Sequence, residues 1–243
     1  MPNKIIFSVD VEKDINQDSF NGVLIGLKNF ENICDKNNIR PVLFVTGEVL
    51  EKFSKIFKRL YKKGWEISSH GYTHKRFDDL SNAEKEKEIQ KIVKLYSKFS
   101  FKLEGFRAPQ HSIDKRTLDL LNKYGFKYDS SYTPLNLFQF LFFPQKIVLN
   151  IRGFFSPLNE YKIRSNLREK PCPSLLIPFV SLTMRVLPKP LIKLYLRILN
   201  IFYKKPIFYA HSWDFIELKN SKIDRKFPHK NLLNKIDYLM SLS

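Results

Sequence analysis

The sequence predicts an α/β domain built on a parallel sheet. Apolar, β-type runs at residues 4–9, 41–45 and 65–67 alternate with segments of helical periodicity. Strands that alternate with helices form βα units, and the strands of such units run parallel. The 243 residues suffice for one such domain with a substantial core. The pattern alone allows either a barrel or an open doubly wound sheet.

The helices between these runs are marked by apolar residues three and four positions apart. The first is expected to have its apolar face at Val23, Leu27, Phe30 and Cys34. The second covers residues 49–60 and ends before Gly64, a residue typical of the position after a helix. Ser81 and Glu84 match the capping box, which predicts the start of a third helix.

Later strands are expected at residues 105–107, 127–129 and 207–210, and a helix is expected at residues 115–124. Between residues 132 and 205 the alternation of strand and helix breaks. Aromatic residues and prolines crowd this part of the chain, so we interpret it as an irregular insertion in the α/β domain.

The insertion contains an apolar helix at about residues 190–204. Its polar residues, Lys193, Arg197 and Asn200, share one narrow face. Two interpretations are open: a helix of the core, or an interfacial helix whose basic stripe faces lipid headgroups. In either case, residues 1–243 are expected to form a single domain.

Composition limits the class of protein. The chain has 42 basic and 24 acidic residues, and its net charge of +18 predicts an anionic partner such as nucleic acid, an acidic glycan or an anionic membrane surface. No zinc-finger or RNP-type motif accompanies the charge. Two cysteines suit a reducing compartment, and the sequence shows neither a signal peptide nor an apolar run of about 18 residues. We therefore expect a cytoplasmic protein, and peripheral association with the inner face of the membrane is a further hypothesis.

Chemically active residues follow almost every predicted strand. The carboxyl ends of parallel strands meet at one edge of a sheet, where α/β enzymes carry their active sites. If residues 70–74 turn helically, their two histidines share a face and, with a carboxylate, make a metal site with open coordination positions. The alternative is two unrelated surface histidines. The candidate residues in chain order are Asp10, Glu12, His70, His74, Arg107, Asp129 and His211.

Four short motifs occur in a fixed order along the chain. They are SVDVE at residues 8–12, HGYTH at 70–74, GFRAP at 105–109 and YAHSW at 209–213. This ordered set resembles the polysaccharide deacetylase family, the NodB-homology carbohydrate esterases, over roughly residues 4–215. The resemblance implies a distorted (β/α) barrel and metal-dependent removal of N- or O-acetyl groups from sugars. It also implies a bound Zn²⁺ or another divalent transition metal such as Co²⁺ or Ni²⁺.

The resemblance assigns the metal ligands as Glu12, His70 and His74. The family's first motif usually has two adjacent aspartates, the earlier a general base and the later a metal ligand. Here Val11 separates the two carboxylates, so a second assignment, in which Asp10 is itself the ligand, stays open.

The resemblance also assigns catalytic roles. Asp10 is matched to the general base, and Arg107 to the arginine that orients it. His211 is matched to the general acid that protonates the leaving amine, and Asp129 to the carboxylate that pairs with this histidine. His111 lies outside the motifs and is expected at the surface.

We therefore expect an enzyme that removes an acetyl group, most simply N-acetyl, from a sugar of a cell-surface polysaccharide or its lipid-linked precursor. One alternative is a glycan-binding relative of the same fold that has lost the chemistry. Another is a nucleic-acid-binding protein, which would need one continuous basic patch. Tyr209 stands where a leucine of the family's acetyl pocket is usual, so the sequence leaves the sugar open, as it does the oligomeric state.

Overall fold

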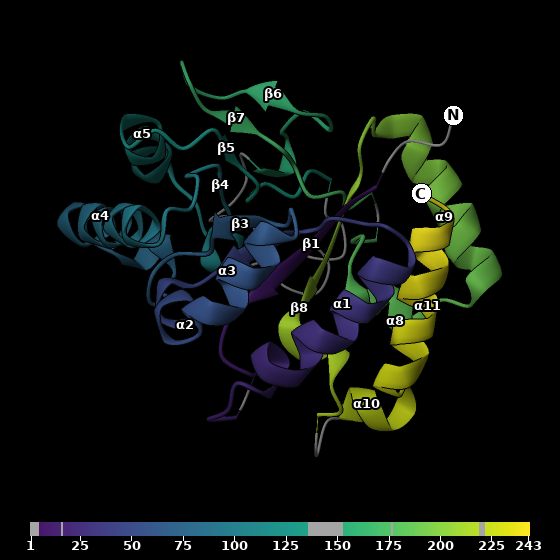
Figure 1. The fold of residues 1–243 in the computed structure, drawn as a ribbon. Coiled ribbons are helices and arrows are strands. Elements are labelled where there is room, and N and C mark those ends of the chain that lie inside the picture. The colour runs from purple at the N-terminus through teal and green to yellow at the C-terminus, as the bar shows by residue number, and fades with distance from the viewer. Residues whose placement is uncertain (1–4, 16, 136–152, 176, 219–221) are drawn as a thin grey trace.

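The computed structural model describes residues 5–15, 17–135, 153–175, 177–218 and 222–243. Its centre is a curled sheet of eight strands with helices packed around it (Figure 1). Most neighbouring strands are parallel, and only β6 and β7 pair antiparallel. The α/β fold predicted from the sequence is confirmed, and the sheet curls into a half-barrel rather than closing.

The strands follow one another across the sheet in nearly continuous chain order. The spatial order is β6-β7-β5-β4-β3-β2-β1-β8, so β8 returns to pair with the first strand. The strands are β1 (Ile6–Val11), β2 (Val42–Val45), β3 (Glu66–Ser69), β4 (Gly105–Phe106), β5 (Tyr128–Asp129), β6 (Tyr161–Lys162), β7 (Arg168–Glu169) and β8 (Ile207–His211).

Helices fill most connections between the parallel strands. In Figure 1, α4 and α5 lie at one side of the sheet and α1, α9 and α11 at the other. The α-helices are α1 (Leu27–Lys36), α2 (Gly47–Lys52), α3 (Ser54–Lys62), α4 (Asn82–Phe99), α5 (Lys115–Lys123), α8 (Ser181–Val186), α9 (Lys189–Phe202), α10 (Lys222–Lys226) and α11 (His229–Ser241). Short helical turns are η1 (Gly22–Gly26), η2 (Phe77–Asp79), η3 (Pro109–His111) and η4 (Ser212–Phe215).

The helix boundaries test the sequence patterns. Ser81 and Glu84 form a complete capping box at the start of α4, as predicted. The single helix predicted over residues 49–60 is wrong, because the chain breaks at Phe53 into α2 and α3. The first helix of this pair is tied at its start to the loop after β3, through hydrogen bonds from Gly47 and Glu48 N–H groups to backbone carbonyls of that loop.

The insertion is partly described. Residues 136–152 of it lie outside the described part of the chain, and the rest supplies β6, β7, α8 and α9. The apolar helix α9 has one buried and one exposed face, so it contributes to the core, and its contact with a membrane stays a prediction. Its residues Ile192, Tyr195, Leu196 and Leu199 are buried, whereas Leu191, Leu194, Ile198, Ile201 and Phe202 are exposed. Among the described residues, no helix combines the length and apolar character that crossing a bilayer requires.

Phe30 of α1 packs against two segments that are far apart in the sequence. Its fully buried ring stacks on Phe215 of η4 at 4.6 Å and meets the edge of Trp65 at 6.0 Å. These contacts join α1, the start of β3 and the turn after β8. The carboxyl end of β8 is therefore held in place by the same core that supports the amino-terminal part of the chain.

We expect Phe30→Ala to lower the free energy of unfolding by about 3–5 kcal/mol, because truncation of a fully buried ring leaves a cavity. Denaturant-induced unfolding measures this change. Leu24→Ala is the matched control: Leu24 precedes the same helix but is 53% exposed, so its loss should change stability by no more than about 0.5 kcal/mol. Equal effects of the two substitutions would contradict the packing described.

Candidate metal and active site

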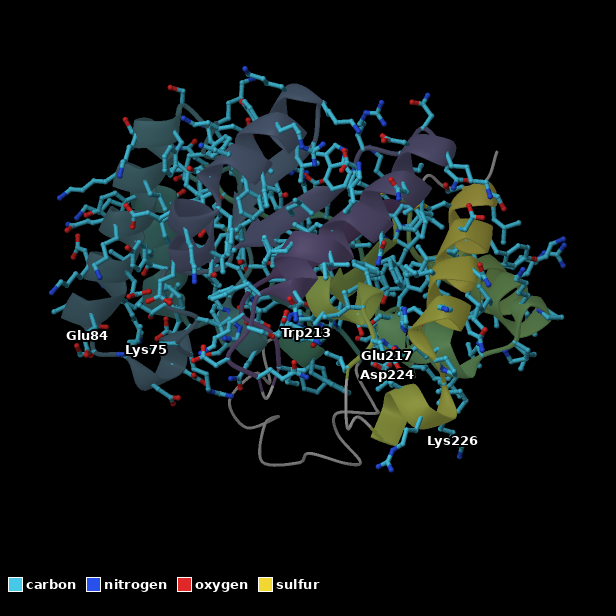
Figure 2. All side chains as sticks on the ribbon, turned by 60° about the horizontal axis from the view of Figure 1, so that its bottom comes forward. Lys75, Glu84, Trp213, Glu217, Asp224 and Lys226 are labelled. Atoms are coloured by element: carbon cyan, nitrogen blue, oxygen red, sulfur yellow. The ribbon has the colours of Figure 1, made fainter. Side chains whose placement is uncertain are left out.

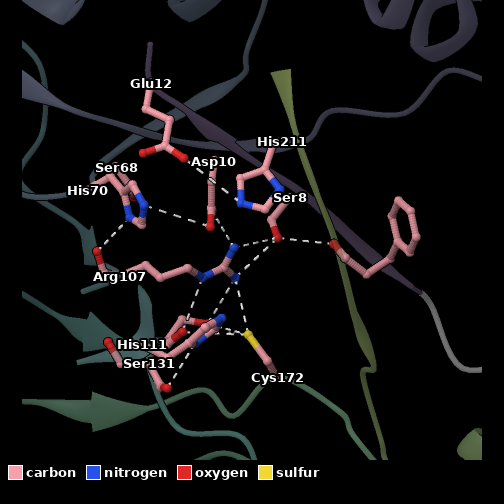
Figure 3. A network of polar contacts seen from close by, with 12 residues as sticks. Ser8, Asp10, Glu12, Ser68, His70, Arg107, His111, Ser131, Cys172 and His211 are labelled. Atoms are coloured by element: carbon pink, nitrogen blue, oxygen red, sulfur yellow. Dashed lines mark hydrogen bonds and ion pairs between the residues drawn. The ribbon is translucent and has the colours of Figure 1, made fainter. Parts of the chain in front are cut away.

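The predicted site residues gather at the carboxyl ends of β1, β3, β4 and β8. Asp10 is the direct register partner of His211 on β8, while His70 follows β3 and Arg107 follows β4 (Figure 3). In Figure 2, where the lower side of Figure 1 comes forward, the buried Trp213 of the turn after β8 lies between the labelled Lys75 and Lys226. The sheet edge expected to carry the chemistry does bring these residues together.

Arg107 lies in the centre of the site and is fully buried. Its guanidinium donates to Asp10 Oδ1 at 2.7 Å, to Ser8 Oγ at 3.1 Å and to the Ser130 carbonyl at 3.1 Å. Burial alone would raise the pKa of Asp10, but the charges of Arg107 and of the nearby histidines together outweigh it and bring that pKa to about 2. Asp10 is therefore ionised at neutral pH and held in one orientation.

Glu12, His70 and His74 form a cluster with metal-ligand character. One ligand atom from each lies within 4.8 Å of the others, and His74 Nε2 contacts the Glu12 carboxylate. His70 Nδ1 donates to the Arg107 carbonyl at 2.8 Å, so the lone pair of the neutral ring is on Nε2. Burial lowers the pKa of His70, which favours this neutral form.

The backbone conformation that brings the two histidines together differs from the helical turn that was expected. Residues 70–74 form a loop rather than a helical turn, with Gly71 at φ 76° and His74 at φ 59°. The two imidazole rings nevertheless lie 5.1 Å apart. A left-handed backbone at His74 is uncommon for a residue other than glycine, and Glu88 supports the loop by accepting from the Tyr72 and Thr73 N–H groups.

His211 pairs with Asp214 and not with Asp129. Its Nδ1 lies 3.7 Å from Asp214 Oδ2, and the same carboxylate accepts from the His211 backbone N–H at 2.8 Å. Burial would lower the pKa of His211, but Asp214 together with the charges of Asp10 and Glu12 outweighs it and raises that pKa. The ring stacks on Trp213 at 4.2 Å, and its Nε2 faces Glu12 at 4.0 Å. The sequence reasoning missed Asp214, although it lies three residues after the predicted histidine.

Asp129 belongs instead to a buried carboxyl pair with Glu169. The two side chains share a hydrogen bond, which requires a proton on one of them. Asp129 accepts from the N–H and the hydroxyl of Ser131, which suits the charged form, so Glu169 holds the proton. Burial and the neighbouring Asp129 raise the pKa of Glu169 well above its usual range. The pairing with His211 expected from the resemblance is therefore wrong.

His111 is a site residue that the sequence reasoning placed at the surface. Its Nδ1 donates to the Ser131 carbonyl at 2.9 Å, and its ring meets the edge of Tyr209 at 5.3 Å. Burial, followed by the Arg107 charge, lowers the pKa of His111 to about 4. Gln110 and His111 both have positive φ, and this local turn directs the side chain inward (Figure 3). A backbone conformation of this kind gives no signal in the sequence.

Part of the chain resembles known polysaccharide deacetylases. The family model for polysaccharide deacetylase matches residues 26–128, so the chain is related to that family, as its motifs predict. Peptidoglycan deacetylase of Helicobacter pylori is 30% identical over 123 residues, which cover 50% of this chain and 42% of the relative. The chain thus spans less than half the length of that relative.

Solved structures confirm the fold over almost the whole chain. A Mycobacterium smegmatis protein, provisionally named a polysaccharide deacetylase, superposes with a TM-score of 0.69 at 16% identity, over 98% of this chain and 84% of that one. A Bacillus anthracis protein described as a CE4 family pseudoenzyme gives 0.54 at 14% identity, over 99% and 62%. At such identities the likeness establishes the fold, and the chemistry has to be argued from the site.

We expect Glu169→Gln to stabilise the protein at pH 8 and to have little effect at pH 4. When folding raises the pKa of a carboxyl group, the protein becomes less stable as the pH rises above the pKa of that group in the unfolded chain. The reason is that the folded state must keep the proton. The amide of glutamine can donate to Asp129 without holding a titratable proton. A gain of about 1 kcal/mol would raise the melting temperature by about 2–4 °C.

Thermal unfolding across this pH range measures the effect. Glu48→Gln is the control, because Glu48 is exposed on α2 and its replacement should shift the melting temperature equally little at both pH values. A Glu169→Gln protein that is less stable than wild type at pH 8 would contradict a protonated Glu169.

Proposed function

We propose that this protein is a metal-dependent hydrolase that removes an acetyl group, N-acetyl in the first instance, from a sugar. One observation carries the proposal: a Glu-His-His cluster lies beside an ionised, arginine-held aspartate and a histidine whose pKa is raised. These are the parts that hydrolysis of an amide requires, namely a site for a Lewis acid, a proton acceptor and a proton donor.

The donor set fits a divalent transition metal. Glu12 offers a carboxylate oxygen, and His70 offers a lone pair on Nε2 because its other ring nitrogen is occupied by the Arg107 carbonyl. A backbone acceptor of this kind fixes the tautomer of a metal-ligating histidine. Two imidazoles and one carboxylate suit Zn²⁺, and also Co²⁺ or Ni²⁺. Such a cation, when bound, polarises the acetyl carbonyl and lowers the pKa of the attacking water.

Asp10 is proposed as the acceptor of the proton from water. Its carboxylate is ionised, and Arg107 fixes one oxygen, so the other is directed toward the cluster, 3.9 Å from His70 Nε2. A carboxylate with a pKa of about 2 is a weak base, and it acts effectively only on water whose own pKa is lowered. In this arrangement Asp10 can therefore accept the proton only when a cation at the metal site lowers the pKa of the water.

His211 is proposed as the proton donor to the leaving nitrogen. Its raised pKa favours the imidazolium form, and Asp214 orients the ring through Nδ1. The opposite nitrogen faces the Glu12 side of the site. Ser181 donates to the same Asp214 oxygen at 2.6 Å, which holds the carboxylate in place. This Asp-His pair is the arrangement in which a general acid is kept in one tautomer.

An acetylated glycan of the cell envelope, or its lipid-linked precursor, is the proposed substrate class. The support is the relationship to polysaccharide deacetylases and the similarity to a peptidoglycan deacetylase. The alternative, a glycan-binding relative without chemistry, needs no cation. The nucleic-acid alternative is not favoured, because Figure 2 shows nitrogen-tipped side chains around the whole outline rather than along one stripe.

The test combines elemental analysis with acetate release from N-acetylated oligosaccharides. Wild type should bind near-stoichiometric zinc and release acetate. His70→Ala/His74→Ala should lose both, whereas His229→Ala, at the start of α11, should lose neither. Asp10→Asn should keep zinc but lower the rate by at least about 100-fold.

The variants also settle the carboxylate ligand. Glu12→Ala should lower the zinc content, because Glu12 is the carboxylate placed with the two histidines. If Asp10→Asn loses zinc and Glu12→Ala keeps it, Asp10 is the ligand instead. A wild-type protein that binds no divalent metal under any loading condition would refute the hydrolase and leave the glycan-binding relative.

We further propose that α9 lies on an anionic membrane surface. Its exposed face carries an apolar stripe at spacings of three and four, Leu191, Leu194, Ile198 and Ile201, and a basic stripe beside it at Lys189, Lys193 and Arg197. An apolar face flanked by cations is the pattern of helices that lie in the headgroup region of a bilayer. This placement suits a lipid-linked substrate.

We expect Leu194→Ser/Ile198→Ser to weaken binding to anionic vesicles by at least about tenfold, because two apolar side chains no longer enter the lipid. Vesicle co-sedimentation measures the change. Leu24→Ser/Ile25→Ser is the matched control, since both side chains are 53% exposed but lie before α1. If the control weakens binding equally, α9 is not the contact surface.

A further inference from the structure

The half-barrel leaves a gap between its two edges at the end opposite the catalytic residues. A cavity of about 270 Å³ lies there, and we call it the seam cavity. Ile6 and Ile207, the first residues of β1 and β8, form one wall, and Arg168 of β7 forms part of the other. Since Asp10 and His211 lie at the far ends of β1 and β8, the seam cavity is separate from the proposed active site.

The seam cavity is strongly basic. Its polar lining comprises Asn159, Glu160, Arg168, Lys170, Lys204 and Lys205. Arg168 pairs with Glu160, the one acidic side chain of the lining. Within the described part of the chain, Lys170, Lys204 and Lys205 have no ion-pair partner within 4 Å. Four cations thus lie around a single carboxylate, although Lys170 Nζ also lies 3.5 Å from the Tyr128 ring centroid. This excess of positive charge favours an anion in the cavity.

The charge and the volume restrict the anion. A phosphate group carries up to two negative charges and three acceptor oxygens, which match an excess of about three cations better than a single carboxylate does. Arginine in particular can present two parallel donors to a phosphate. The cavity is large enough for a headgroup and too small for a folded peptide or a polymer.

The cavity opens beside the exposed apolar end of α9. The Asn159 side chain donates to the Phe202 carbonyl at 2.9 Å and accepts from the Lys204 N–H at 2.7 Å, which fixes the lysine pair just after the helix. Ile201 is 76% exposed and Phe202 is 44% exposed at this end. A ligand in the cavity therefore has cations around its head and an apolar surface next to it.

We propose that the seam cavity binds the terminal phosphate group of a lipid, whose chains lie along the exposed face of α9. The proposal rests on the membrane contact proposed above and gives it chemical specificity. It makes this end of the half-barrel the lipid-binding end and leaves the opposite end for the acetylated sugar.

The experiment compares vesicles of phosphatidylcholine with added phosphatidic acid or phosphatidylserine, adjusted to equal surface potential. Wild type should bind phosphatidic acid vesicles about tenfold more tightly than phosphatidylserine vesicles. Lys204→Ala/Lys205→Ala should reduce this ratio to about one. Lys55→Ala/Lys62→Ala removes the same charge from exposed positions of α3 and should keep the ratio. An unchanged ratio in the Lys204/Lys205 variant would overturn the proposal.

Two further measurements distinguish a failure of the phosphate site from a failure of the membrane contact. Leu194→Ser/Ile198→Ser should weaken binding to both kinds of vesicle without changing their ratio, because the apolar face does not distinguish headgroups. If inorganic phosphate stabilises wild type but not Lys204→Ala/Lys205→Ala, and phosphatidic acid is not preferred, the ligand is a soluble phosphate and the lipid assignment is wrong. Zinc content and acetate release test the catalytic proposal independently of either result.

Discussion

The buried ion pair of Arg107 and Asp10 is the interaction on which the site depends. The guanidinium lies 4.0 Å from the Phe44 ring centroid and is hydrogen-bonded on several sides to groups of β1 and of the segment after β5. A buried charge is tolerated only when it is paired and its donors are satisfied, and loss of one partner typically costs about 3–5 kcal/mol. The pair therefore fixes the distance between β1 and β4, on opposite sides of the histidine loop.

Arg107 also connects the proposed base to the proposed metal site. Its side chain holds Asp10, while its own backbone carbonyl accepts from His70 Nδ1. One residue thus sets the orientation of a carboxylate and the tautomer of an imidazole that face the same space. Movement of β4 would disturb both groups together. The short strand Gly105–Phe106 therefore helps to position Asp10 and His70, although neither residue belongs to it.

The sequence predicts the parts of the site that depend on strand ends. Asp10, Arg107 and His211 could be found because each follows a recognisable apolar run, and parallel strands bring such positions to one edge. Asp214, Glu169 and His111 could not. Asp214 acts through a short turn, Glu169 comes from the irregular insertion, and the direction of His111 is set by two positive φ angles. Contacts that tertiary structure alone creates leave no periodic signal.

An open half-barrel has two ends that meet different environments. At the carboxyl ends of the strands, Asp10 and His211 are register partners, so the residues of the proposed chemistry are held by two paired strands. At the other end, the edges of the sheet do not pair with each other, and the seam cavity fills the gap. A gap lined by apolar side chains alone would favour closure of the sheet. Cations on both sides of a gap repel each other, so this lining disfavours closure unless an anion lies between them, in agreement with the proposed phosphate ligand.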